Sequence, residues 1–279
     1  MINKKYKIQK NTVQETLIIP LYNRKCAMDM YPHLFYDNEC QSLFEYIDYD
    51  FKPQGRFKNK MGAIMAATRQ YDMSCICKQY LKEHPKACVV NIGCGLDTTF
   101  RQIDNGTAKG YNIDFYDVIQ IRNELLSQKE REINIACDIM DFSWFDKIDY
   151  KEEDGIVFFA SGVFYYFKKD DIKALFLAIS KHFSKGKIAF DTTNQKGLKN
   201  MAKTWLEPSK MKNINVYFCV DDETELYTFS QNFKKVVRKG YMAGYRPLDK
   251  SFGLILNCLF QIIDRIKWCQ IIEITFCDS

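Results

Sequence analysis

The stretch Cys88–Asp97, with the sequence CVVNIGCGLD, constrains the fold of this chain more than any other. Its apolar first half predicts a short buried strand, and Gly93 and Gly95 mark a tight turn directly after it. A second strand-like segment ends at Asp114. In open α/β sheets such glycines allow a ligand to approach closely, and the acid accepts hydrogen bonds from ribose hydroxyls. We therefore expect a nucleoside site here.

Two kinds of nucleoside site compete for this pattern. A dinucleotide site has G-x-G-x-x-G, because its third glycine lets helix and strand pack closely around a pyrophosphate. Thr98 stands at that third position, and the Gly-Lys-Ser/Thr ending of a phosphate-binding loop is missing. What remains is G-x-G-x-D followed by Asp114, the pattern of S-adenosylmethionine sites. An ordinary strand-to-helix turn stays open as the alternative.

A long helix is predicted over residues 59–83, where methionines and other apolar residues share one face. Arg69 interrupts this apolar stripe midway between Met65 and Met73. An unpaired guanidinium is costly to bury, so Arg69 is expected to meet an anion. Either it reaches the surface or pairs with a carboxylate of the core, or it clamps the carboxylate of a ligand through its bidentate fork.

Strands and helices alternate after this stretch, which predicts a parallel sheet with helices on both faces. The segment 155–160 is apolar throughout and is predicted to be a central strand. Ligands of such sheets bind at the carboxyl ends of the strands. The residues predicted at those ends are Gly93, Asp114, Asp138, Ser161 and Asp191.

Composition excludes several classes of function. The net charge of +5 is small and its lysines are scattered, so nucleic acid is not an expected partner. No apolar run approaches the ~18 residues of a membrane span, and no signal peptide is recognised, which favours a cytoplasmic protein. The 11 cysteines lie in apolar contexts and are expected to be reduced. With three histidines and no paired ligand spacing, no metal site is expected.

Six short motifs together point to a known family. They are IIPLYNR (18–24), IDYDF (47–51), NIGCGLDT (91–98), NID (112–114), ACDI (136–139) and GVFYYF (162–167). This set resembles the leucine carboxyl methyltransferase family, and more closely its bacterial branch of polyketide-type O-methyltransferases. The resemblance extends over residues 15–195.

The resemblance implies a single domain over residues 1–279 with the Rossmann-like α/β fold of class I methyltransferases. Its sheet would have seven mostly parallel strands, with the last strand antiparallel. Residues 1–85 would form a helical lid region, and residues 86–196 and 234–279 the core. An insertion after strand five, residues 197–233, would cap the substrate.

The resemblance also implies S-adenosylmethionine as methyl donor, with S-adenosylhomocysteine as product. Carried over to matching positions, Arg69 would hold the methionine carboxylate. The turn of Gly93 and Gly95 would receive the amino-acid part, and Asp114 the ribose hydroxyls.

Three further positions complete the implied donor site. Asp138 and Ile139 would frame the adenine. Ser161 stands where the family usually has a glutamate near the amino group of the donor, so one charge partner of the ammonium is missing. Lower cofactor affinity is expected from this departure.

Methyl transfer from a sulfonium is an in-line displacement, so the protein mainly aligns the reactants and excludes water. A carboxylate acceptor needs no general base, whereas a hydroxyl would benefit from one. Asp191, Tyr165 and Tyr166 are expected near the mouth of the site, although the tyrosines equally fit aromatic packing. The expected activity is O-methylation of a small-molecule hydroxyl or carboxylate. A non-catalytic S-adenosylmethionine-binding protein of the same fold is the alternative.

Overall fold

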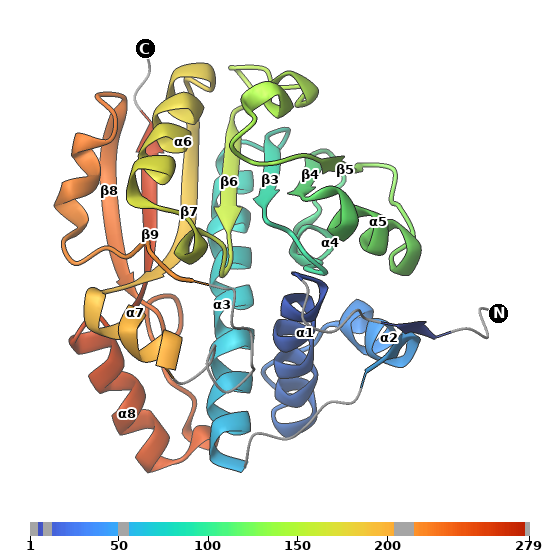
Figure 1. The fold of residues 1–279 in the computed structure, drawn as a ribbon, viewed down its shortest axis with the longest axis vertical. Helices are drawn as coiled ribbons and strands as arrows, with labels where there is room; N and C mark the ends of the chain where they lie inside the picture. The colour runs from blue at the N-terminus through green and yellow to red at the C-terminus, as the bar shows by residue number, and fades with distance from the viewer. Residues whose placement is uncertain (1–4, 8–12, 50–55, 204–214, 277–279) are drawn as a thin grey trace.

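A seven-stranded sheet forms the centre of the molecule (Figure 1). The computed structural model describes residues 5–7, 13–49, 56–203 and 215–276. The strands lie in the order β5-β4-β3-β6-β7-β9-β8. They are β3 (Cys88–Ile92), β4 (Lys109–Asp114), β5 (Glu132–Ala136), β6 (Ile156–Ala160), β7 (Gly186–Thr193), β8 (Phe233–Gly240) and β9 (Cys269–Phe276).

The topology of this sheet reverses at β3. From β3 the chain proceeds outward through β4 to β5, then returns to the other side of β3 for β6 and β7. These five strands are parallel, and β9 is antiparallel to both β7 and β8. Ile92 pairs with Ile113 on one side and with Ala160 on the other, so three strand ends lie level. The predicted α/β sheet is confirmed, and its switch point is the expected ligand position.

Helices cover both faces of the sheet. Successive side chains of a strand point to opposite faces, so neighbouring residues of β3 belong to two different cores. Val90 belongs to one apolar core with α6 (Lys169–His182) and the short helix η1 (Phe142–Lys147). Val89 belongs to a second core with α3 (Arg56–Glu83) and α8 (Leu254–Arg265). Central strands buried on both faces explain the continuous apolar run in β6.

The chain before β3 is mainly helical: α1 (Val13–Met30) and α2 (Asn38–Tyr46) lie beyond the carboxyl ends of β3 and β4, whereas α3 runs along one face of the sheet (Figure 1). A third apolar cluster joins its first two helices to Leu96 and to α5. One local feature is unpredicted: a two-stranded parallel sheet pairs Tyr6 with Ile47. The elements are β1 (Tyr6–Lys7), α1, α2, β2 (Ile47–Asp48), α3, α4 (Thr99–Ile103) and α5 (Tyr116–Leu125).

The predicted insertion lies between β7 and β8. It begins with α7 (Gln195–Met201), which Figure 1 shows beside α8. Residues 204–214 of the insertion, and Asp50 and Phe51 of the IDYDF motif, lie outside the described residues. The remaining short helices are η2 (Phe164–Tyr166), η4 (Glu223–Thr228) and η5 (Lys250–Phe252). Within the described ranges, no helix combines the length and the apolar character that a membrane crossing requires.

Candidate functional site

A cavity of about 930 Å³ lies at the carboxyl ends of the central strands. Its wall combines residues of α1 and α3 with the segments that follow β3, β4, β6 and β7. This volume is near the upper end for small-molecule pockets, so it has room for a nucleoside and a second compound. Six of the seven predicted site residues line it: Arg69, Gly93, Gly95, Asp114, Ile139 and Ser161.

The turn after β3 needs its glycines. Gly93 has φ +65° and Gly95 φ +48°, a region that side chains disfavour. A Cβ on Gly93 would lie 2.5 Å from Val163 Cγ2, in the loop after β6. Gly93 and Gly95 thus add only backbone to the cavity wall, beside the lining residues Cys94, Leu96 and Asp97. That is the shape required by a ligand that must approach the strand end closely.

Asp114, at the end of β4, is bound to this turn. Its Oδ2 accepts a hydrogen bond from Gly95 N at 2.8 Å, and its Oδ1 accepts one from Phe115 N at 2.8 Å. Burial raises the pKa of Asp114, while these two amides act in the opposite direction. Each carboxylate oxygen keeps lone-pair capacity on a cavity-lining side chain. The arrangement fits the two hydroxyls of a ribose.

A buried ionic network that the sequence analysis missed supports the turn from below. Arg122 of α5 donates through Nη1 to Gly95 O at 3.0 Å and to Asp97 O at 2.6 Å. Its Nη2 pairs with Glu132 Oε1 at 2.8 Å, and Arg101 Nε pairs with Glu132 Oε2 at 2.7 Å. Although burial opposes ionisation, the two arginines lower the pKa of Glu132. One signal in the sequence could have revealed this network: Arg122 directly follows Ile121, on the face of α5 that is buried.

Arg24 ties α1 to the same turn. Its Nη1 pairs with Asp37 Oδ2 at 3.1 Å, and its Nη2 donates to Leu96 O at 3.0 Å. Thr98, which replaces the third glycine of a dinucleotide motif, donates its hydroxyl to the Asp37 carboxylate. The N-terminal helices are therefore anchored on the glycine turn, and Arg24 is a lining residue of the cavity.

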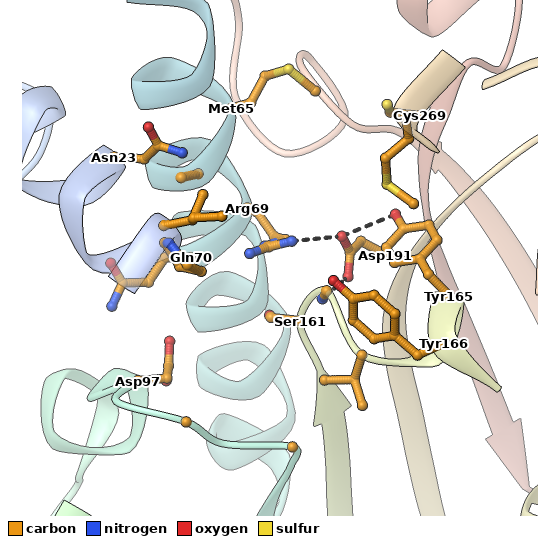
Figure 2. Close-up of a pocket in the computed structure, with 18 of the residues that line it drawn as sticks. Asn23, Met65, Arg69, Gln70, Asp97, Ser161, Tyr165, Tyr166, Asp191 and Cys269 are labelled. Atoms are coloured by element: carbon orange, nitrogen blue, oxygen red, sulfur yellow. Dashed lines mark hydrogen bonds and ion pairs between the residues drawn. The ribbon is translucent and has the colours of Figure 1, made fainter. Parts of the chain in front are cut away.

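Arg69 meets the anion that it was expected to need. Its Nη1 lies 2.9 Å from Asp191 Oδ2, and the two side chains are 17% and 2% exposed. Figure 2 shows Arg69 reaching from α3 towards Asp191, with Tyr165 and Tyr166 nearby. Although burial opposes its charge, the Asp191 carboxylate raises the pKa of Arg69. Of the roles considered for Arg69, the structure contains the ion pair with a carboxylate of the core. Arg69 also lines the cavity.

Asp191 collects two further hydrogen bonds. Its Oδ2 also accepts from the Tyr165 hydroxyl at 3.1 Å, and its Oδ1 accepts from Gly162 N at 2.6 Å. Gly162 has φ +75°, and a Cβ there would lie 2.7 Å from Arg69 Nη1. Ser161 precedes this glycine and lines the cavity. These hydrogen bonds hold the loop after β6 in contact with β7.

The structure separates the two residues predicted around the adenine. Ile139 is buried and lines the cavity, and its carbonyl accepts a hydrogen bond from Trp144 Nε1 at 3.1 Å. Asp138 is exposed and is not a lining residue. Its Oδ1 accepts from Met140 N at 2.9 Å, which shapes the loop after β5. Asp138 therefore affects the cavity only indirectly, because it stabilises the loop that carries Ile139.

The half of the cavity that lies away from the glycine turn and Asp114 has an aromatic wall. Burial raises the pKa of Tyr165 and of Tyr241, which keeps both phenols neutral. Tyr241 donates to Met65 O at 3.2 Å, and the ring of Tyr166 is 39% exposed where it lines the cavity. Tyr217 and Trp268 complete this aromatic wall. Across the described ranges, no three His, Cys, Asp or Glu side chains converge as a metal site would require.

Comparisons with known proteins agree with this geometry. The Streptomyces glaucescens tetracenomycin polyketide synthesis O-methyltransferase TcmP is 26% identical over 180 residues, which cover 64% of this chain and 65% of TcmP. The match thus spans slightly less than two thirds of that relative. A crystal structure from Thermobifida fusca has a TM-score of 0.58 at 10% identity, covering 95% of this chain and 98% of that one.

A second solved structure has the same fold. It is the plantazolicin methyltransferase BamL, in complex with S-adenosylhomocysteine and a triazolic desmethylPZN analog. Its TM-score is 0.54 at 12% identity, covering 96% of this chain and all of that one. The sequence model of the leucine carboxyl methyltransferase family matches residues 24–180, more than half of the chain. The resemblance noted in the sequence is confirmed: this chain belongs to the leucine carboxyl methyltransferase family, a family of S-adenosylmethionine-dependent methyltransferases.

Proposed function

We propose that this protein transfers a methyl group from S-adenosylmethionine to a hydroxyl oxygen of a small aromatic compound. One observation carries the donor assignment: the Asp114 carboxylate is held by Gly95 N in a glycine turn on a cavity wall. Family membership supports the same donor. The cavity volume supports a donor and an acceptor bound together.

The donor would lie across the ends of β3, β4 and β6. In this proposal Asp114 holds the ribose hydroxyls, and the turn of Gly93 and Gly95 accommodates the amino-acid part. Arg69 holds the carboxylate, because a guanidinium fork suits that group. The position of Ser161 beside the turn supports a contact with the donor. On the adenine side, Ile139 would contact the base, and Asp138 would hold its loop in shape.

Two features favour a hydroxyl acceptor over a carboxylate. The acceptor half of the cavity is mainly aromatic, with Tyr166 and Trp268 among its walls. Among the described lining residues the cations are Arg24, which pairs with Asp37, and Arg69, which this proposal assigns to the donor carboxylate. A carboxylate acceptor would lack a partner there, and a buried unpaired charge is costly. The relative TcmP is named as a polyketide synthesis O-methyltransferase, which supports transfer to an oxygen atom.

The residues of this chain would act by binding, orientation and exclusion of water. S-adenosylmethionine, when bound, supplies a methyl group on a positively charged sulfur. Arg69 and Asp114 would fix the two ends of the donor, so that the methyl group faces the aromatic half of the cavity. The aromatic walls would hold the acceptor against it and keep water out.

Binding and turnover test this proposal separately. Calorimetry with S-adenosylmethionine and with NAD should detect binding of the first alone, and NAD binding in its place would overturn the donor assignment. Transfer of labelled methyl groups should then be measured on matched pairs of phenols and aromatic carboxylic acids. We expect product from phenols. Donor binding with no product from either series would favour the non-catalytic alternative, which the serine at 161 motivates.

A further inference from the structure

Arg69 and Asp191 present opposite charges side by side on the wall of the cavity. The two side chains are in contact at 2.9 Å, and both are lining residues. An α-amino acid carries the mirror arrangement, with a carboxylate and an ammonium on one carbon. Of the proposed ligands, only the donor has such an end. A buried charged pair beside a ligand cavity can therefore recognise a zwitterion without leaving either charge unpaired.

We propose that Asp191 binds the α-ammonium group of S-adenosylmethionine while Arg69 binds its carboxylate. This inference rests on the proposed function and assigns a further specificity residue to it. Asp191 has the capacity, because a carboxylate has about four lone-pair sites. Gly162 N, the Tyr165 hydroxyl and Arg69 occupy three of them. The site left on Oδ1 accepts the ammonium.

The strand register places this carboxylate next to the donor turn. Ala160 pairs with Phe190 in the parallel β6–β7 ladder, so Ser161 and Asp191 are the next neighbours along the two strands. The loop after Ser161 packs against the glycine turn, because Val163 fills the space beside Gly93. Asp191 thus supplies the negative charge that a serine at 161 cannot, from the adjacent strand.

The charges of the cavity agree with this assignment. Among the described lining residues, two arginines and three aspartates give a formal charge of one negative. S-adenosylmethionine carries a sulfonium, an ammonium and a carboxylate, which is one positive in total. Asp97 is the competing partner for the ammonium. Its Oδ1 accepts from Thr99 N at 2.8 Å and from Asn91 Nδ2 at 3.2 Å, within its own turn. Among the described residues Asp97 forms no ion pair with Arg69, so it lacks the adjacent opposite charge that Asp191 has.

A ligand that lacks the amino group isolates this contact. S-adenosylhomocysteine and its desamino analogue should be titrated into the wild-type protein by calorimetry. We expect the desamino analogue to bind about 10- to 100-fold more weakly, as the loss of a charge-assisted hydrogen bond implies. In Asp191→Asn this preference should fall to about threefold or less, since an amide oxygen is a neutral acceptor. The desamino analogue should bind the variant no more weakly than the wild type.

Two further variants keep the test decisive. Asp191→Glu leaves Arg69 with a charged partner, so it should fold even where Asp191→Asn does not. It should lose most of the preference because its carboxylate is displaced by one methylene. Asp97→Asn is the matched control and should keep the preference. A preference retained in both Asp191 variants, or lost in Asp97→Asn, would overturn the inference. Wild-type protein that binds neither ligand would instead overturn the proposed donor.

Discussion

The two halves of the cavity are built in different ways. The donor half is made of backbone and short side chains at the ends of neighbouring strands, where Gly95 and Asp114 are joined by a hydrogen bond. The acceptor half is made of large side chains from distant segments, such as Met65 and Tyr241, which are 176 positions apart. The glycine turn and Asp114 are specified by local sequence, whereas the acceptor half depends on tertiary packing, as does the Arg69–Asp191 pair.

This difference has a physical consequence for mutation. The donor half is supported by buried charges and strained turns, whose loss leaves unpaired groups or steric clashes. The acceptor half is supported by aromatic contacts that can repack around a changed side chain. We therefore expect substitutions under the donor half to affect folding as well as binding. Substitutions in the acceptor half should mainly affect turnover.

The largest loss of stability at constant pH is expected from the ionic network under the glycine turn. Arg122→Met should lower the free energy of unfolding by about 3–5 kcal/mol, because Glu132 stays buried with one of its two arginines gone. The carbonyls of Gly95 and Asp97 would also lose their donor. Denaturant unfolding measures the loss.

Arg131→Met serves as the matched control for that experiment. Arg131 pairs with Asp104 at 2.7 Å, but this ion pair is at the surface, where such pairs contribute little. Its unfolding midpoint should therefore stay close to that of the wild type. Equal losses in the two variants would mean that the network under the turn is no more important than a surface pair.

A buried carboxylate behind the acceptor half should make stability depend on pH. Neither oxygen of Asp72, on α3, has a hydrogen-bond partner among the described residues. Burial raises the pKa of Asp72 to about 8, against the attraction of Arg246 and Lys239. Between about pH 4 and pH 8 the folded protein then binds more protons than the unfolded chain, so this group lowers the unfolding free energy as pH rises. The change over this range should be on the order of 6 kcal/mol.

Asp72→Asn checks the sign of this prediction. The amide cannot ionise, so the variant should lose that decline and should become more stable than the wild type at about pH 9. Denaturant unfolding of both proteins at several pH values gives the comparison. Parallel pH profiles would show that Asp72 does not change protonation on folding.

The same contrast explains what the sequence could predict. Strand β3, its turn and Asp114 follow from local rules, because periodicity, glycine and the acidic strand end act within a short segment. Arg69 was recognised as a cation in need of an anion, since a charge on an apolar helical stripe is a local signal. Its partner Asp191 is 122 positions away, and no local pattern joins the two. Pairing of that kind depends on the completed sheet.

Charges buried beneath the site were the main omission. Arg122 and Glu132 belong to a helix and a strand whose apolar neighbours alone suffice to predict those elements. From the sequence alone, a charged residue at such a position is predicted to be exposed to solvent. Only the tertiary structure shows that it is buried. The aromatic wall was predicted only in part for a related reason. Tyr165 and Tyr166 were expected near the mouth of the site because they follow a strand end, but Tyr241 is one of many tyrosines in the sequence and only the folded chain brings it to the cavity.

Within the donor half, Asp114 and Asp138 should differ. Asp114→Ala should weaken S-adenosylmethionine binding by about 1–3 kcal/mol, because it removes a charged acceptor from the proposed ribose position. Asp138→Ala should have a much smaller effect, since its carboxylate lies outside the cavity and bonds only to the loop. Calorimetric titration of the two variants measures both. A larger loss from Asp138→Ala would reverse the assignment of the donor half.

The smallest effect is expected in the acceptor half. Tyr166→Phe removes one hydroxyl from the aromatic wall and keeps the ring, so the packing should survive. We expect kcat/KM for a phenolic acceptor to fall by about 3- to 10-fold, the equivalent of one neutral hydrogen bond. The affinity for S-adenosylmethionine should not change, because the Tyr166 hydroxyl is not among the hydrogen-bond partners of Arg69 and Asp191 in the described structure. Steady-state kinetics with saturating donor, beside calorimetry of the donor alone, separates the two quantities. If donor affinity fell as much as turnover, the division of the cavity into two independently built halves would not hold.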